Sequence, residues 1–277
     1  MSMEKGDVNA LKPDALAPAE ILAKAEGAGV TKANMAVGKC FVSAMLAGAF
    51  IAFGGTYFCV FLGDSTIPFA AQRMVGGICF CLGLVLVLCC GSELFTGNSL
   101  MAAAKASGKI TWGGLAKNWV VVFLGNLAGA LCAVALIYLA KVYTLNGGGV
   151  GEAMVTVAAG KVTPDWFTLF FKGIMCNIFV CLAVWIGFGA RTTADKVLGI
   201  ILPISAFVAC GFEHCVANMF FLPTGLLLNT VAGVGAAGTI TLGGVLFNLS
   251  AATLGNIVGG VLVGMAYWYI YHKKAEK

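Results

Sequence analysis

The distribution of charge constrains the fold of this chain more than any other feature, because long stretches carry no charged residue at all. A helix that spans a bilayer needs roughly 20 mostly apolar residues, and it bonds its own backbone groups, as a water-free environment requires. With 60% hydrophobic and 10% charged residues, the chain differs from soluble domains. The charge-free stretches are 40–63, 74–92, 118–140, 173–190, 197–212 and 215–271.

The last of these stretches is long enough for more than one crossing. Residues 215–271 can complete a helix begun in 197–212, turn at 229–244 and cross once more. We therefore predict an all-α polytopic membrane protein with six transmembrane helices in a domain over 37–272, followed by a short tail at 273–277.

The segment 1–36 is polar or weakly amphipathic and has no apolar run beside a cleavage site, so we expect no cleavable signal peptide and a cytoplasmic N-terminus. Within it, Pro18 can start a short helix that ends at Gly27 or Gly29. We expect this helix to lie on the surface at the membrane boundary.

The lysine and arginine residues set the orientation, since cytoplasmic loops carry an excess of both. With the N-terminus inside, thirteen of the 17 cations fall on cytoplasmic segments and both termini are cytoplasmic. Arg73, Lys141 and Lys161 fall on the opposite face, and Lys172 lies near the start of the fourth stretch, where it can reach the interface. This asymmetry accounts for the net charge of +5, which therefore does not indicate nucleic-acid binding. A bacterial inner membrane is the expected location.

A short motif occurs twice in the chain. CGSELFTGN at 90–98 and CGFEHCVAN at 210–218 share the frame Cys-Gly-x-Glu, four residues, Asn, and each is followed by a Leu-Gly-Asn, at 124–126 and 254–256. Each half holds three predicted spans, so the second half enters the membrane from the opposite side. This pattern predicts two inverted three-helix repeats, whose interface near the midplane holds the transport path.

Glycines and polar residues interrupt an apolar span in each copy of the motif, so we expect the second and fifth helices to break there. Unwound backbone is tolerated at membrane depth only where protein buries it or a cavity lines it. The expected break positions are Gly91, Ser92, Thr96, Gly97 and Asn98 in the first copy, and Gly211 and Asn218 in the second.

The other polar residues of these spans are expected to serve structure, with one exception. Glu93 and Glu213 should accept hydrogen bonds from loop amides, because a carboxylate facing an anion path would repel the anion; a proton relay is the alternative. Asn126 and Asn256 should bond between helices, beside the GxxxG glycines 125, 129, 255 and 259 that allow close packing. The exception is His214, because ionisable residues inside a membrane are functional by default.

Eleven cysteines lie mostly in apolar spans, where they pack as small apolar side chains; examples are Cys79, Cys81, Cys89, Cys90, Cys132, Cys176 and Cys181. The histidines are His214 and the terminal His272, and no Cys-x-x-Cys is present. These counts argue against a metal site, a cofactor and a membrane redox enzyme, so we expect no enzymatic activity. Paired Asn-Pro-Ala motifs of aquaporins and the paired pore histidines of ammonium channels are also absent.

Several stretches resemble the formate/nitrite transporter family over nearly the whole chain. CGSELFTGN resembles the family's loop in the second helix, GFEHCVANM resembles its counterpart in the fifth, and KNWVVVFLGNLAGAL and KGIMCNIFVCLAVW also match. RMVGGICFCLGL and AKASGKITWGGLAKNW are most similar to formate channels, whereas SELFTG and FFKGIMCN are also similar to nitrite and hydrosulfide members. Thr96 is followed by Gly-Asn rather than the Ser-Thr of formate channels, so nitrite and hydrosulfide stay open as substrates.

The resemblance implies an aquaporin-like protomer, a homopentamer with one pore in each protomer, and a proton-linked path for small monovalent anions. By position, it implies that the pore histidine is His214, the loop threonine Thr96, the asparagine facing the histidine Asn177, and the conserved lysine Lys161 rather than Lys172. It also implies apolar constrictions at Phe80, Leu84, Leu94, Phe95 and Phe207.

A mechanism follows from the cost of moving an anion through an apolar slit, which is far higher than the cost for its neutral acid. We expect Lys161, in the outer loop before the fourth span, to raise the local anion concentration. His214, positioned by Thr96 and Asn177, would then donate or relay the proton that neutralises the anion at the constriction. Direct protonation by water is the alternative that the sequence leaves open.

Overall fold

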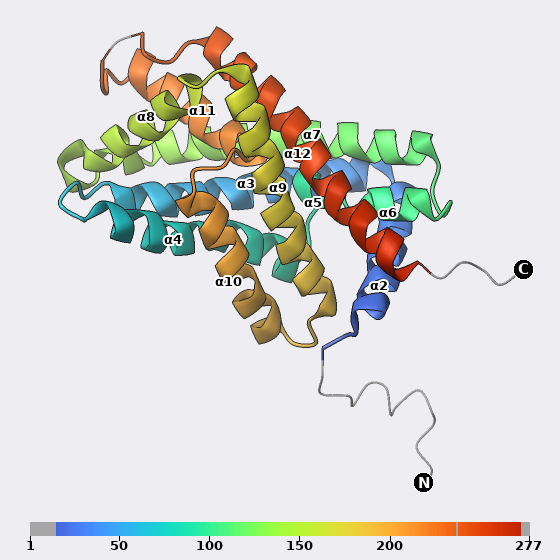
Figure 1. Cartoon of the computed structure of the whole chain (residues 1–277). Coiled ribbons are helices and arrows are strands. Elements are labelled where there is room, and N and C mark those ends of the chain that lie inside the picture. Colours follow the sequence, from blue (N-terminus) through green and yellow to red (C-terminus); the bar gives the residue numbers. More distant parts are fainter. Residues whose placement is uncertain (1–14, 237, 273–277) are drawn as a thin grey trace, which may run out of the picture.

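The computed structural model describes residues 15–236 and 238–272, so the predicted tail at 273–277 lies outside the described residues. Within the described part, helices dominate and the two described ends of the chain come close together, since α2 packs against α12 (Figure 1). The elements are α2 (Pro18–Asn34), α3 (Val37–Leu62), α4 (Phe69–Cys90), α5 (Phe95–Asn98), α6 (Met101–Ala106), α7 (Trp112–Leu139), η1 (Val142–Thr144), η2 (Asn146–Gly148), α8 (Gly149–Val162), α9 (Trp166–Gly189), α10 (Thr193–Ala209), α11 (Cys215–Thr230) and α12 (Leu242–Tyr271).

Five helices of the described residues, α3, α4, α7, α9 and α12, are long and apolar enough to cross a membrane. Four of them, α3, α4, α7 and α9, contain most of one predicted span and begin before it, so α9 starts at Trp166 and includes Lys172, where the charge-free stretch starts at Gly173. The fifth, α12, lies inside the stretch 215–271. A charge-free stretch marks the apolar part of a helix, whereas the backbone hydrogen bonds of these four helices begin before the charged residue on its N-terminal side. The predicted turn at 229–244 is confirmed by the gap between α11 and α12.

Two helical segments are interrupted, between α4 and α5 and between α10 and α11. Beyond Cys90 the chain leaves α4 at Gly91, with φ of 80°, and beyond Ala209 it leaves α10 and passes Gly211, with φ of 69°. This left-handed region favours glycine, which is why both copies of the motif carry one there. The predicted breaks at Gly91 and Gly211 are confirmed. The break at Ser92 is confirmed as well, since this residue lies outside any helix. The breaks at Thr96, Gly97, Asn98 and Asn218 are wrong, because these residues lie inside α5 and α11.

The N-terminal helix α2 begins at Pro18, as predicted, but it continues to Asn34 rather than ending at a glycine. Gly29 allows close packing instead, since a Cβ built on it would lie 2.8 Å from the Cβ of Ala104 in α6. Leu22 and Ala25 are buried against the bundle. The helix is therefore a packed part of the fold rather than only a surface segment.

A helix also occupies the predicted outer loop. In α8, Val150, Met154, Val155 and Ala158 are buried, at the spacing of one helical face. This face packs on α11 and α3 at the end of the bundle remote from α2 (Figure 1). The loop interpretation of 146–163 is wrong because the short, glycine-rich segment gives a weak apolar signal that only its packing completes.

Close helix packing at the GxxxG glycines is confirmed. A Cβ on Gly125 or Gly129 would clash with α3, and a Cβ on Gly255 or Gly259 would clash with α9. The cysteines differ among themselves: Cys79, Cys81, Cys176 and Cys181 are buried, whereas Cys89, Cys90 and Cys132 are exposed on the surface of this chain. The packing role predicted for those three is therefore not seen within the chain.

Candidate functional site

The imidazole of His214 is held from both ring nitrogens where α11 begins. His214 is the N-cap of this helix, and its Nδ1 accepts a hydrogen bond from the backbone N–H of Ala217 at 3.0 Å. Its Nε2 lies 2.9 Å from Oγ1 of Thr96. A nitrogen that accepts a bond from an amide carries no proton, so the ring is the neutral tautomer with its proton on Nε2, donated to the threonine hydroxyl.

Thr96 belongs to α5 and reaches His214 across the contact between the two interrupted helices. Asn177 of α9 is fully buried and donates from Nδ2 to the carbonyl oxygens of Thr96, at 3.1 Å, and Asn256, at 2.6 Å. The structure thus brings Asn177 to Thr96 but gives it no hydrogen bond to His214. Its effect on the histidine passes through the threonine.

His214 lines two cavities. The larger one has a volume of about 320 Å³ and opens at the α8 end of the bundle, where Lys161, Lys172 and Arg73 also line it. The smaller one, about 10 Å³, lies deeper and is lined by Leu84, Leu94 and other apolar side chains. A volume of this size holds no more than one water molecule, so the path is closed beyond the histidine.

Aromatic rings separate the two cavities. Phe80 and Phe207 line both of them and meet edge to face, with ring centroids 5.8 Å apart. Phe207 also stacks on His214 at 5.9 Å. Phe95 departs from the predicted set of constrictions, because it lines neither cavity and packs instead against Phe123 of α7, at 5.2 Å.

Beside His214, the carboxylate of Glu213 is the centre of a cluster, which we call the α8-end cluster. Lys161 donates to both oxygens of Glu213 at 3.2 Å, and Asn218 and Asn248 donate to one of them at 2.6 and 3.1 Å. The expected partners, loop backbone amides, are replaced by side chains. The loop position of Lys161 is also wrong: it lies in the last turn of α8, with 14% of its side chain exposed.

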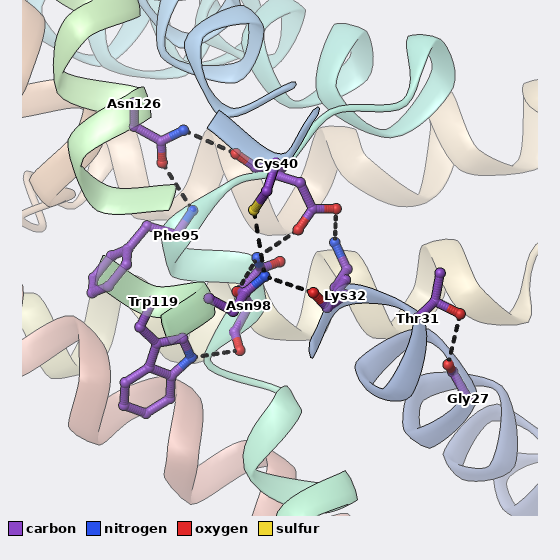
Figure 2. Close-up of polar contacts among 10 residues, drawn as sticks. Gly27, Thr31, Lys32, Cys40, Phe95, Asn98, Trp119 and Asn126 are labelled. Carbon is purple, nitrogen blue, oxygen red and sulfur yellow. Dashed lines mark hydrogen bonds and ion pairs between the residues drawn. The ribbon is translucent and has the colours of Figure 1, made fainter. Parts of the chain in front are cut away.

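A matching cluster, which we call the α2-end cluster, surrounds Glu93. Lys32 of α2 donates to one oxygen at 2.6 Å and Asn98 donates to the other at 2.8 Å, while Asn98 also bonds Asn118 of α7 (Figure 2). Sequence reasoning assigned no role to Lys32, Asn118 or Asn248. The signal that could have found them is their place in the repeat, since Asn118 and Asn248 each precede the Leu-Gly-Asn asparagine by eight residues.

Asn126 and Asn256 fasten the two breaks to the neighbouring helices. Asn126 accepts a hydrogen bond from the backbone N–H of Phe95 (Figure 2). It donates to the carbonyls of Ala44 and Glu93. Asn256 repeats the arrangement with Cys215, Gly173 and Glu213. The predicted bonding between helices is confirmed, and these bonds satisfy backbone groups that the breaks leave open.

Neither a cluster of metal ligands nor a disulfide is found among the residues that the structure describes. In 15–236 and 238–272, no three His, Cys, Asp or Glu side chains are grouped as metal ligands. The described cysteines form no disulfide. The polar pair of His214 and Thr96 lies where an open charged cavity and an apolar pocket meet, since His214 lines both.

Comparisons with known proteins match this chain over nearly its full length. The family model described as formate/nitrite transporter matches residues 19–269. The formate channel FocA of Escherichia coli strain K12 is 42% identical over 276 residues, which cover 95% of this chain and 97% of that protein. A probable formate transporter of Methanothermobacter thermautotrophicus is 37% identical, covering 93% and 97%. A solved pentameric formate channel with formate bound has a TM-score of 0.80 at 39% identity, covering 86% of this chain and 98% of that one.

Proposed function

The chain belongs to the formate/nitrite transporter family, and from this premise we propose that it is a membrane channel for formate. It is a multi-pass membrane protein of a family of channels and transporters, not of enzymes. Support for formate comes from the relatives named above, all of them described by that substrate. Nitrite and hydrosulfide are the alternatives, because SELFTG and FFKGIMCN are similar to those branches as well.

The finer architecture belongs to the same proposal. We assign six membrane crossings, of which α4 with α5 and α6 forms the second and α10 with α11 the fifth, in an aquaporin-like arrangement of inverted repeats. The matching hydrogen bonds of Asn126 and Asn256 support the repeat. The distribution of cations supports an orientation with both termini cytoplasmic and the α8 end outside. The similar pentameric channel and the bacterial relative support a homopentamer in a bacterial inner membrane. The N-terminal segment 1–36 and the tail 273–277 then lie in the cytoplasm.

One observation carries the mechanism: His214 borders both the open outer cavity and the closed apolar pocket. An anion that enters the outer cavity meets the imidazole ring beside Phe207, which contacts Phe80, where little water remains to solvate the anion's charge. Because a neutral acid crosses apolar surroundings at far lower cost than its anion, protonation at this point removes most of the barrier.

We assign the proton transfer to the two ring nitrogens of His214. A proton from the water of the outer cavity binds Nδ1 as the bond from Ala217 is released, and the proton on Nε2 passes to a formate oxygen. The products are formic acid and a neutral imidazole, so charge and atoms balance. Thr96 holds Nε2 in line with the path, and Asn177 holds Thr96. Leu84 and Leu94 then form the apolar passage for the neutral acid.

Flux through purified protein in liposomes tests this function. Formate, nitrite and hydrosulfide are each presented at two pH values, and formate should enter fastest, with more flux at the lower pH. The matched control is His214→Phe, which fills the polar site with a ring of similar width and should abolish formate flux. Nitrite or hydrosulfide entering clearly faster than formate would replace the proposed substrate. Absence of flux for all three would overturn the channel function itself.

A further inference from the structure

The outer cavity carries more positive than negative charge. Its lining includes the cations Arg73, Lys161 and Lys172 and the carboxylate of Glu213. With His214 neutral, three positive charges and one negative charge leave a net charge of +2. A cavity of one sign with apolar walls concentrates ions of the opposite sign.

Lys161, the lysine expected to attract anions, is not the source of this excess. Both carboxylate oxygens of Glu213 lie 3.2 Å from its Nζ, and only 14% of its side chain is exposed. Its charge is therefore matched within the α8-end cluster. The unmatched charge resides on the two other cations of the cavity.

Arg73 and Lys172 have no carboxylate within ion-pair distance among the residues that the structure describes. Arg73, in the first turns of α4, lies over the ring of Phe69, with its guanidinium carbon 5.3 Å from the ring centroid. Lys172 lies in α9. Both side chains are half-buried, so the cavity walls shield them from bulk water while leaving them open to an ion.

These two cations flank the loop that carries His214. A Cβ built on Gly211 would lie 4.0 Å from Nη1 of Arg73, which places the guanidinium beside the break between α10 and α11. The carbonyl of Lys172 accepts a bond from the backbone N–H of Glu213 at 3.3 Å, on the α9 side of the same loop. An anion bound by these two cations would therefore lie near His214.

The fold does not require either charge. In the other repeat, the bond that Lys172 makes to Glu213 is made to Glu93 by the carbonyl of Ser43, at 3.4 Å. The spacing of 120 residues that relates Gly91 to Gly211 places Thr193 opposite Arg73. The same backbone arrangement thus forms with a serine and a threonine, which leaves the two cations free for a role in binding.

We propose that Arg73 and Lys172 form an anion-capture site for a small monovalent carboxylate, a site that rests on the proposed formate function. The planar guanidinium can donate two parallel hydrogen bonds to both oxygens of one carboxylate, with the Phe69 ring fixing its plane. Lys172 of α9 adds a second charge to the lining of the same cavity. Capture raises the local concentration of the anion before the proton-transfer step, so the site governs KM more than the maximal rate.

The test measures initial uptake of labelled formate into right-side-out membrane vesicles that contain the full chain, over a range of formate concentrations and at low and high salt. The double variant Arg73→Gln/Lys172→Gln should raise KM about 3- to 10-fold at low ionic strength, with little change in the maximal rate. This difference in KM should shrink as salt screens the charges.

Two further variants refine the test. Arg73→Lys keeps the charge but loses the two parallel hydrogen-bond donors of the guanidinium, so it should keep the salt dependence and raise KM less than Arg73→Gln. Lys141→Gln, an exposed cation at the same end of the bundle, is the matched control and should match the parent.

The outcomes separate the site from the function. A double variant with the KM and the salt dependence of the parent would overturn the capture site and leave the channel function standing, and so would a lower maximal rate with unchanged KM, because that result indicates a structural role. If the parent itself shows no saturable formate uptake, the proposed function fails, and the capture site fails with it.

Discussion

The α2-end and α8-end clusters share a hydrogen-bond pattern but differ in their neighbours. In each, a lysine and an asparagine donate to a buried glutamate, and this asparagine also bonds a second asparagine, at 2.8 Å for Asn98 with Asn118 and 2.7 Å for Asn218 with Asn248. The α8-end cluster holds its glutamate by more bonds, because Lys161 reaches both oxygens of Glu213 and Asn248 donates to it as well. The residue after the glutamate differs: Leu94 in the first repeat and His214 in the second.

This comparison separates the scaffold from the site. What the two repeats share, the glutamates and the asparagines, closes the broken helices and satisfies buried polar groups. What they do not share, His214 in place of Leu94 and Lys172 in place of Ser43, faces the outer cavity or borders it. We infer that duplication kept the frame and that the asymmetry carries the transport chemistry.

Removing the central carboxylate of either cluster should produce the largest loss of stability among these variants, and both clusters should show it. Glu93→Ala or Glu213→Ala leaves a lysine and buried asparagine amides without their acceptor, at a cost of about 3–5 kcal/mol. Thermal unfolding of the detergent-purified protein should show a strong decrease in Tm for both variants. Glu152→Ala, at an exposed position of α8, is the control. An unchanged Tm in one of the two would show that the clusters are not equivalent.

Truncating the asparagines that fasten the breaks should have the next largest effect. Asn126→Ala and Asn256→Ala each remove three hydrogen bonds to backbone groups, for a loss of about 2–3 kcal/mol. The same Tm measurement applies, with the exposed Asn34→Ala as the control. If the Tm of one variant is far lower than that of the other, the two repeats share the bonding pattern but differ in how much it contributes to stability.

Lysine substitutions should have the smallest effect on stability and should distinguish the ends. Lys32→Met and Lys161→Met leave a glutamate that keeps its asparagine donors, so each loss should stay at about 1–2 kcal/mol. The loss should be larger for Lys161, whose side chain is 14% exposed, than for Lys32, at 22%. The reverse order in Tm would contradict burial as the cause of the difference.

The repeat and the positions of the helix breaks could be predicted from sequence because glycine and glutamate occur at matching places in apolar surroundings. Gly91, Gly211, Asn126 and Asn256 were all identified in this way. The pairing of His214 with Thr96 came from family resemblance, since no local pattern relates residues 118 positions apart.

Other features needed three-dimensional structure. The helix α8 is hard to predict because its apolar face is short. The charge balance of Lys161 depends on Glu213, which lies 52 positions away in the sequence. The helix α2 also continues through Gly29, where α6 approaches closely. In each case, a contact between distant segments outweighs the local preference of the sequence.

The central claim is that His214 links formate flux to protons, which Leu94 in the other repeat cannot do. His214→Asn tests it most directly, because asparagine keeps a hydrogen-bond donor and acceptor of similar reach but does not titrate near neutral pH. Formate flux into vesicles is measured by stopped flow from roughly pH 5 to 8, the range around an unperturbed imidazole. The variant should conduct formate, lose the steep pH dependence of the parent and fail to accumulate formate when the outside is acidic. Superimposable flux curves for the variant and the parent over this range would contradict the claim and show that the proton comes directly from water.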